Sequence, residues 1–356
     1  MHKDDQMTPM ERLTGFLTGG EMDRILTMPF IISVSGKAAG MSHRQKRETG
    51  ASEAHCQIAS YERFGNDLLI TEYGLHSVGI SMGSEVLDTE DAVPHITKHV
   101  LDDIKNIDSL DFEKALPENS AECKKHLECE KILVEKMGAE VPSGTLIPGP
   151  LTAASSIYPV DKLLRATRKN PDLVHQLMRS CSDVIKEVHN AFIKEGSMVL
   201  WCEPIGTGDI INPKQYREFV LPYTIELMKN IHDKGGMVCY HICGNTTKIL
   251  PDMVTAGADM ISVDNVVSLA YAKEIVEPYM PIVGNIDPLT TMALGDPAEV
   301  FEETKKCIAT GYNAQHGYIY ATGCDLNVTV PLENIDAMMA AARKYGKYPI
   351  NPENWD

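Results

Sequence analysis

The chain has 356 residues, of which 43% are hydrophobic and 23% charged, a composition typical of a soluble globular protein. Its formal net charge of −17, without any basic stripe, argues against nucleic acid and anionic membrane surfaces as partners. No apolar run reaches the roughly 18–20 residues of a membrane-spanning helix, the polar start lacks the apolar core of a signal peptide, and the nine cysteines are scattered. We therefore expect a protein of the reducing cytoplasm.

In chain order, a polar segment at residues 1–24 carries a helix from Thr8 to about Gly19. Short apolar runs then alternate with helical blocks, and a longer irregular stretch runs from Tyr73 to about Asp111. Eight runs predict strands, at 28–34, 67–72, 145–150, 198–204, 237–243, 260–264, 281–287 and 318–324. The helical blocks between and after them include 50–64, 119–138, about 150–194, 212–234, 268–278, 296–310 and 331–345.

This alternation of strand and helix favours a parallel sheet whose strands are covered on both faces. Eight strands, each followed by helical material, predict an α/β fold of the (β/α)₈ TIM-barrel type with an N-terminal helical extension at residues 1–24. An open doubly wound sheet is the alternative, but no Gly-x-Gly-x-x-Gly turn follows any strand. Because no Pro- or Ser-rich linker divides the chain, we expect a single domain over 1–356.

Chemically active side chains gather at the carboxyl ends of the predicted strands, where the active site of a barrel lies. The residues at these ends are Glu72, Pro150, Glu203, His241, Cys243, Asp264, Asn285, Asp287 and Cys324. His241 and Cys243 are two residues apart, so an extended chain points both to one side. Together with Cys324 they would give three protein ligands and a free position, as in a catalytic zinc site. The plainer interpretation is a buried histidine with two core thiols.

Other strand-end residues allow both a catalytic and a structural role. Glu203 follows an apolar strand and could be an exchangeable zinc ligand or a general acid or base, or else a carboxylate that caps a helix. Cys202 would then point to the opposite face. Asp287 could orient His241 or contact substrate, or form a turn before Pro288. The expected substrate-binding residues are Tyr73, Asn285 and Asp264, with His76 also near the mouth.

Several motifs resemble the uroporphyrinogen decarboxylase superfamily, and within it the methylcobamide:coenzyme M methyltransferases. They are His241-Ile242-Cys243-Gly244, Gly284-Asn285-Ile286-Asp287-Pro288, Thr322-Gly323-Cys324 and Pro331-Leu332-Glu333-Asn334-Ile335, in a resemblance that spans roughly residues 8–345. The resemblance implies a TIM barrel, with zinc held by His-x-Cys and a later Cys. Decarboxylases of this superfamily carry an arginine-rich loop early in the chain, which Ile31–Lys37 lacks here.

The resemblance also implies methyl transfer from a methylated corrinoid to a zinc-bound thiol such as coenzyme M. Since the chain has no Asp-x-His-x-x-Gly cobalamin loop, the corrinoid would be carried by a partner protein. Two alternatives stay open. The enzyme could instead move a methyl group from a methoxylated or methylamine substrate to a Co(I) corrinoid, or the chain could be a decarboxylase or a non-catalytic corrinoid- or metal-binding module.

Overall fold

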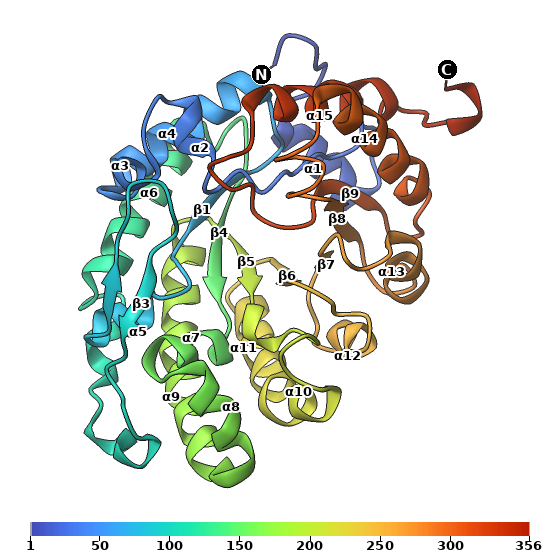
Figure 1. The fold of residues 1–356 in the computed structure, drawn as a ribbon. Helices are drawn as coiled ribbons and strands as arrows, with labels where there is room; N and C mark the ends of the chain where they lie inside the picture. The colour runs from blue at the N-terminus through green and yellow to red at the C-terminus, as the bar shows by residue number, and fades with distance from the viewer. Residues whose placement is uncertain (1, 356) are drawn as a thin grey trace.

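The computed structural model describes residues 2–355. Seven parallel strands form one sheet that curls into a half-barrel, with helices packed around its outer face (Figure 1). The predicted TIM-barrel-like α/β fold is therefore confirmed. In spatial order the strands are β1 (Leu69–Glu72), β4 (Ser143–Pro148), β5 (Met198–Cys202), β6 (Val238–Ile242), β7 (Met260–Val263), β8 (Ile282–Ile286) and β9 (Tyr318–Thr322).

The longer helices begin and end close to the predicted positions because their caps are encoded locally, whereas the short helices at 35–38, 43–47 and 77–82 lie in stretches predicted to be irregular. The side chain of Thr8 accepts a hydrogen bond from the Glu11 amide and Gly19 ends the same helix at φ 67°, while Asp296 begins a later helix with a capping box. The helices are α1 (Pro9–Thr18), α2 (Ser35–Ala38), α3 (His43–Arg47), α4 (Gly50–Phe64), α5 (Ser77–Met82), α6 (Ala121–Met137), α7 (Pro150–Ile157), α8 (Val160–Lys169), α9 (Pro171–Lys194), α10 (Pro213–Phe219), α11 (Leu221–Asp233), α12 (Leu250–Val254), α13 (Leu269–Val276), α14 (Pro297–Gly311) and α15 (Leu332–Tyr345). None of these described helices is long and apolar enough to cross a membrane.

The predicted strand at 28–34 is wrong. The chain does pass between β9 and β1, where Thr27 bridges Tyr320 and its carbonyl accepts from the Asp67 amide at 2.9 Å. Beyond this point Pro29 has no amide hydrogen to donate. Most of the next amides bind side chains instead of a neighbouring strand: that of Phe30 donates to Thr322 Oγ1 at 3.0 Å, and those of Ile32 and Ser33 donate to Asp325. An irregular segment therefore takes the eighth position of the barrel.

Side chains alternate along the strands between the barrel interior and the helical layer. The interior is filled by a compact apolar cluster, which includes Leu68, Ile70, Leu200, Cys239, Met260, Val283, Ile319 and Ala321. The residues between them, such as Trp201 and Tyr240, face the helices and belong to the larger outer core. This alternation decides which strand-end residues can reach the barrel mouth.

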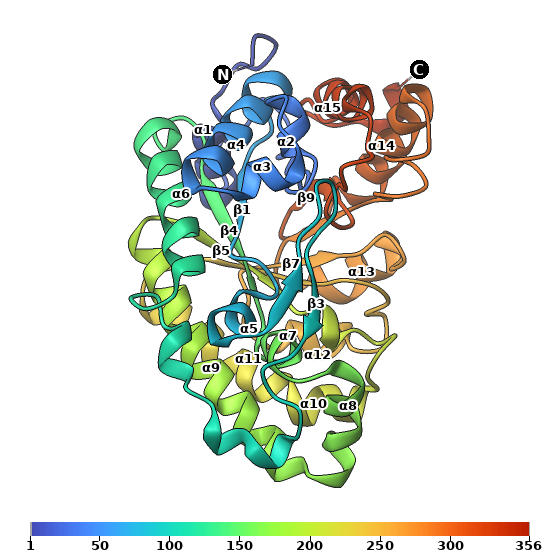
Figure 2. The ribbon, with the colours of Figure 1, turned by 60° about the vertical axis from the view of Figure 1, so that its left-hand side comes forward.

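The irregular stretch after β1 contains a short antiparallel hairpin, formed by β2 (Glu85–Leu87) and β3 (His95–Lys98). Figure 2 shows the hairpin standing in front of the parallel strands. Val93 and Pro94, which lead into β3, line the cavity at the barrel mouth. The hairpin thus forms one wall of the cavity described below.

Candidate active site

The end of β6 brings an imidazole and a thiol together inside the barrel mouth. His241 follows Cys239 on the inward face of the strand, and Cys243 comes two residues later. His241 Nε2 lies 3.3 Å from Cys243 Sγ. Cys324, in the loop after β9, places its Sγ 3.6 Å from Cys243 Sγ. The structure thus joins the three predicted ligands in one cluster.

Cys202 is a fourth donor that the sequence interpretation had excluded, and that exclusion is wrong. Cys202 is the register partner of His241 in the parallel pair β5–β6, so both side chains point inward. The donor atoms of Cys202, His241 and Cys243 all lie within 4.8 Å of one another. The mouth therefore holds three thiols and one imidazole.

These donors have the spacing and chemistry that suit zinc. Ligand atoms about 2.0–2.3 Å from a tetrahedral ion lie roughly 3.3–3.8 Å apart, which matches the two distances in the cluster. Hydrogen bonding to Cys202, together with burial, raises the pKa of Cys243 well above its ordinary value. Hydrogen bonding to Cys243 does the same to Cys324. Crowded thiols cannot all ionise without a cation between them, and a bound metal would supply one.

His241 is held in place from its other nitrogen. Nδ1 lies 3.0 Å from Ser262 Oγ on the neighbouring strand β7, and the ring packs 5.6 Å from that of Phe30. Because Ser262 engages Nδ1, Nε2 is left to face the thiols.

The expectation that Glu203 faces the metal cluster is wrong. Glu203 follows Cys202 and so turns to the opposite side of β5, where it is fully buried against the start of α7. Its carboxylate accepts hydrogen bonds from the amides of Leu151 at 3.1 Å and Thr152 at 2.7 Å, and from the Thr152 hydroxyl. Burial raises the pKa of Glu203 to about 7. Glu203 therefore caps the start of α7, which is the structural alternative given for it above.

Asp287 forms a turn and does not orient His241, so the catalytic role expected for it is wrong. One of its carboxylate oxygens accepts from the amides of Leu289 and Thr290, and the other from the Thr290 hydroxyl, at 2.8, 2.9 and 2.6 Å. The ring of His241 is held by Ser262 instead.

Asp264 and Asn285 shape the loops around the cluster. Asp264 Oδ2 accepts from the Gly244 amide at 2.7 Å and so fixes the turn after Cys243. The Asn285 amide group donates to the carbonyls of Asp264 and Val267, at 3.0 and 2.8 Å. Neither side chain lines the cavity in the described part of the chain, so both support the site from behind.

Tyr73 does not line the mouth either. It is fully buried on the outer side of β1, where its ring packs against His126 and Phe192 at 6.3 Å. His76, three residues later, does line the cavity.

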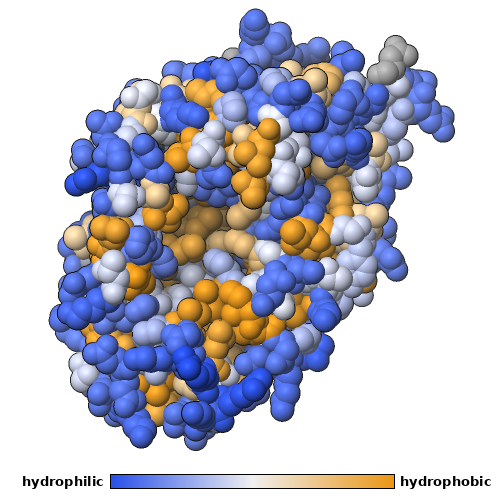
Figure 3. Space-filling model, in the orientation of Figure 1, coloured by the Kyte–Doolittle hydropathy of each residue, from blue (hydrophilic) through white to orange (hydrophobic). Residues whose placement is uncertain are grey.

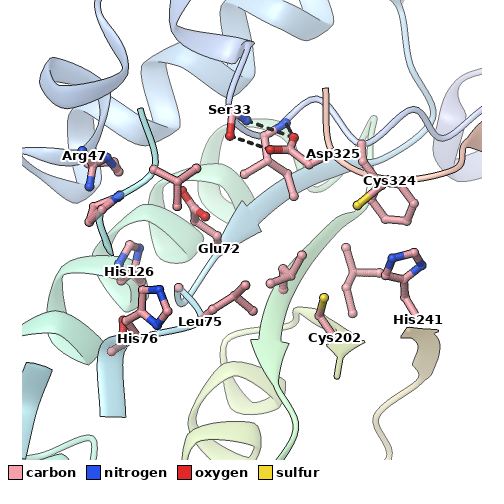
Figure 4. A pocket seen from close by; sticks show the side chains of 18 of the residues that line it. Ser33, Arg47, Glu72, Leu75, His76, His126, Cys202, His241, Cys324 and Asp325 are labelled. Carbon is pink, nitrogen blue, oxygen red and sulfur yellow. Dashed lines mark hydrogen bonds between the residues drawn. The ribbon is translucent and has the colours of Figure 1, made fainter. Parts of the chain in front are cut away.

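The cluster lies at one end of a cavity of about 180 Å³ that opens at the barrel mouth. Figure 3 shows the hollow in this face, with hydrophobic side chains around it. Figure 4 shows Cys202, His241 and Cys324 at one end and Arg47, His76 and His126 at the other. At this second end the sequence interpretation named Glu72 and His76 but missed Arg47 and His126, which come from α3 and α6 and not from strand ends.

Comparisons with known proteins agree with this architecture. A family model described as uroporphyrinogen decarboxylase (URO-D) matches residues 8–345. The methylcobamide:CoM methyltransferase MtaA of Methanosarcina barkeri (strain Fusaro / DSM 804) is 26% identical over 347 residues, which cover 96% of this chain and 99% of that protein. A uroporphyrinogen decarboxylase of Trichlorobacter lovleyi is 29% identical over 238 residues, 64% of this chain and 68% of that protein.

A solved structure, a methyltransferase from Methanosarcina mazei, superimposes with a TM-score of 0.83 and 24% identity, over 96% of this chain and 99% of that one. This likeness shows that the two proteins share a fold. The match of the family model over nearly the whole chain shows more: the chain belongs to the uroporphyrinogen decarboxylase family.

Proposed function

We propose that the protein is a zinc-dependent methyltransferase that moves a methyl group from a methyl-corrinoid, carried by a separate protein, to a small thiol. The observation that carries this proposal is the convergence of His241, Cys243 and Cys324 at one end of a cavity, with donor distances of 3.3 and 3.6 Å. Three such ligands leave a coordination position for a substrate sulfur.

The relatives support this activity over decarboxylation. The relative from Methanosarcina barkeri (strain Fusaro / DSM 804), which this chain covers over 99% of its length, is named a methylcobamide:CoM methyltransferase. The segment Ile31–Lys37, where decarboxylases carry their arginines, presents Ile32 and Ser33 to the cavity. Its one cation, Lys37, donates instead to the carbonyl of Val330 at 2.8 Å. This segment therefore offers the cavity no cation for the carboxylates of a tetrapyrrole.

Each part of the site has a role in this reaction. His241, Cys243 and Cys324 would hold the zinc, which when bound lowers the pKa of a thiol that ligates it. Ser262 fixes the imidazole, and Asp264 fixes the turn that carries Cys243. The substrate thiol releases its proton to water at the open barrel mouth, and its sulfur then forms a bond to the methyl carbon while the cobalt–carbon bond breaks. The electron pair of that bond stays on cobalt, which passes from Co(III) to Co(I).

The cavity opens at the barrel mouth, with the metal cluster at one end. A corrinoid carried by a separate protein would present its methyl face at this mouth, so the carrier protein would dock on the rim. Glu203, which caps α7, would serve this arrangement by positioning the loop after β4 and not by proton transfer.

Cysteine variants test the proposal. Zinc content and methylation of a thiol by free methylcobalamin are measured for the parent protein, Cys324→Ala, Cys202→Ala and the control Cys307→Ala on α14. We expect Cys324→Ala to lower zinc affinity and turnover by roughly 100-fold or more, because it removes one of three ligands. Cys202→Ala should keep its zinc, because the proposed ligands are His241, Cys243 and Cys324; loss of zinc in this variant would mean that Cys202 fills the position proposed for the substrate sulfur.

Two results would count against this function. Unchanged thiol methylation in Cys324→Ala would exclude the zinc-thiolate mechanism. Zinc binding without methylation of any thiol would point instead to methyl transfer from a methoxylated or methylamine substrate to a Co(I) corrinoid, or to a binding module.

A further inference from the structure

The three proposed metal ligands are not held equally by the sheet. His241 belongs to β6, and Cys243 follows directly after the end of this strand, where Asp264 fixes the amide that comes next. Cys324 lies two residues beyond the end of β9, outside the ladder of hydrogen bonds that joins β8 and β9. The sheet therefore places the first two ligands but does not by itself place Cys324.

Asp325, the residue after Cys324, connects this loop to a distant part of the chain. Its Oδ1 accepts hydrogen bonds from the amides of Ile32 and Ser33, each at 3.1 Å, and its Oδ2 accepts one from the Ser33 hydroxyl. Figure 4 shows Ser33 and Asp325 joined in this way beside Cys324. Both carboxylate oxygens are thus engaged by a residue that lies 292 positions away in the sequence.

The segment that binds Asp325 also contacts the other side of the metal cluster. Val34 donates its amide to the Leu326 carbonyl, and the Leu326 amide donates to the Phe30 carbonyl, both at 3.0 Å. The ring of Phe30 packs 5.6 Å from that of His241. The irregular segment in the eighth barrel position therefore touches the imidazole and holds the loop that carries the distant thiol.

The contacts of Asp325 differ from those of an ordinary turn after a strand. Asp287, which follows β8, also accepts hydrogen bonds from two amides and one hydroxyl. Its donors are Leu289 and Thr290, two and three residues later, so these bonds close a local turn. Asp325 uses an equivalent set of donors to join two segments that are far apart in the chain.

We propose that Asp325 is a positioning residue for the metal centre, because it holds the loop from which Cys324 reaches the cluster. One residue anchors the loop, and the residue before it carries a thiol that lies 3.6 Å from Cys243 Sγ. Groups that orient metal ligands typically contribute about 10–100-fold to metal affinity. This inference rests on the proposed function, since it requires Cys324 to be a zinc ligand.

Metal binding by Asp325→Ala tests the inference, with Asp287→Ala as the matched control. Zinc affinity is measured by competition with a chelator. Cobalt(II) is then bound in place of zinc, because the intensity of its thiolate-to-cobalt absorption reports the number of thiolate ligands. We expect Asp325→Ala to bind zinc about 10–100-fold more weakly than the parent protein, and its cobalt spectrum to approach that of Cys324→Ala. Asp287→Ala loses an equivalent set of hydrogen bonds and should match the parent in both measurements.

Two further variants separate the effect of position from those of charge and misfolding. Asp325→Asn keeps an oxygen that can accept from both amides, so its zinc affinity and cobalt spectrum should stay close to those of the parent. Ser33→Ala removes the hydroxyl and keeps the carboxylate with its two amide bonds. It should weaken zinc binding by about two- to tenfold, the range for one hydrogen bond. Ser33→Ala therefore decides the matter if Asp325→Ala does not fold.

The outcomes distinguish this inference from the proposed function. Parent-like zinc affinity and cobalt spectrum in Asp325→Ala, with only a lower melting temperature of the metal-free protein, would mean that the contact stabilises the fold alone. That result would overturn the inference and leave the methyltransferase proposal standing. Zinc binding by Asp325→Asn as weak as that of Asp325→Ala would do the same, because charge would then explain the effect, and so would unchanged affinity in Ser33→Ala. A cobalt spectrum of Cys324→Ala equal to that of the parent would overturn both proposals.

Discussion

His189 on α9 is fully buried and packs against Trp201 of β5, with 5.3 Å between the ring centroids. Neither of its ring nitrogens makes a hydrogen bond, so nothing offsets the cost of charging it there. Burial lowers its pKa from 6.5 to about 3. The folded protein therefore contains a neutral imidazole over a pH range in which the unfolded chain carries a protonated one.

This difference predicts acid-sensitive stability that originates at one side chain. Below pH 6.5 the unfolded state binds a proton at His189 and the folded state does not until about pH 3, so stability falls as the pH falls between these values. From pH 7 to pH 5 the loss is about 2 kcal/mol. His189→Phe should lose correspondingly less stability over this interval, as measured by urea unfolding at both pH values. The exposed His55→Phe is the control, and equal pH dependence in parent and His189→Phe would contradict the prediction.

At the scale of single residues, the sequence predicted the direction of a side chain only where the answer did not depend on which face of the strand turns into the barrel. His241 and Cys243 are separated by one residue, so they share a face whichever way the strand is turned. Cys202 and Glu203 are adjacent, so only one of them can face the mouth. β5 is buried on both sides and its sequence shows no alternation that identifies its inner face. The pairing of Cys202 with His241 shows that Cys202, and not Glu203, faces the barrel mouth. No local sequence pattern reveals this pairing.

At the scale of elements, the barrel end opposite the cavity is tied together by buried ion pairs. Asp67, just before β1, accepts from Arg12 of α1 and from Arg24 Nη1 at 2.6 Å, and also from the Thr27 amide at 2.7 Å. Arg24 in turn binds Asp5 at 2.9 Å. One carboxylate thus joins α1, the segment in the eighth barrel position, and the first strand.

Removing that charge should destabilise the fold strongly. Asp67→Asn keeps the shape of the side chain but removes the carboxylate that Arg12 and Arg24 share, so that Arg12 keeps only Asp23 and Arg24 only Asp5 as close partners. Loss of one partner from such a buried network should cost up to about 3–5 kcal/mol. Asp336→Asn is the matched control, because its pair with Arg63 is solvent-exposed and should contribute about 1 kcal/mol or less. Urea unfolding at neutral pH compares the two, and a similar small loss in both variants would show that the buried network is not what fixes these elements.

The segment in the eighth barrel position, residues 28–34, is also where a strand was wrongly predicted. Residues 28–34 have the apolar, β-branched composition of a strand, but Pro29 and the side-chain acceptors Thr322 and Asp325 take its amides out of the sheet. These acceptors come from the far end of the chain, about 290 residues away, so local composition could not reveal them. Helix ends, which depend on caps a few residues away, were predicted closely.

At the scale of the whole molecule, the cavity is assembled from parts that are distant in sequence. The strands supply the metal-binding end, α3 and the loop after β1 supply the polar end, and the β2–β3 hairpin supplies Val93 and Pro94 as an outer wall. Val93 lines the cavity yet is 56% exposed, so a bound substrate could cover part of its side chain. The position of the hairpin indicates that it shields the bound substrate from water.

Shortening this hairpin should weaken substrate binding without disturbing the metal ligands. Glu85 and Lys98 are paired in register, so residues 86–97 can be replaced by a Gly-Gly turn that keeps the flanking geometry. Removing the apolar contacts of Val93 and Pro94 should cost about 1–2 kcal/mol, or roughly tenfold in the dissociation constant of the substrate thiol. Zinc content should not change, since His241, Cys243 and Cys324 lie on other elements. Unaltered thiol affinity in the shortened protein would mean that the hairpin is no part of the binding wall.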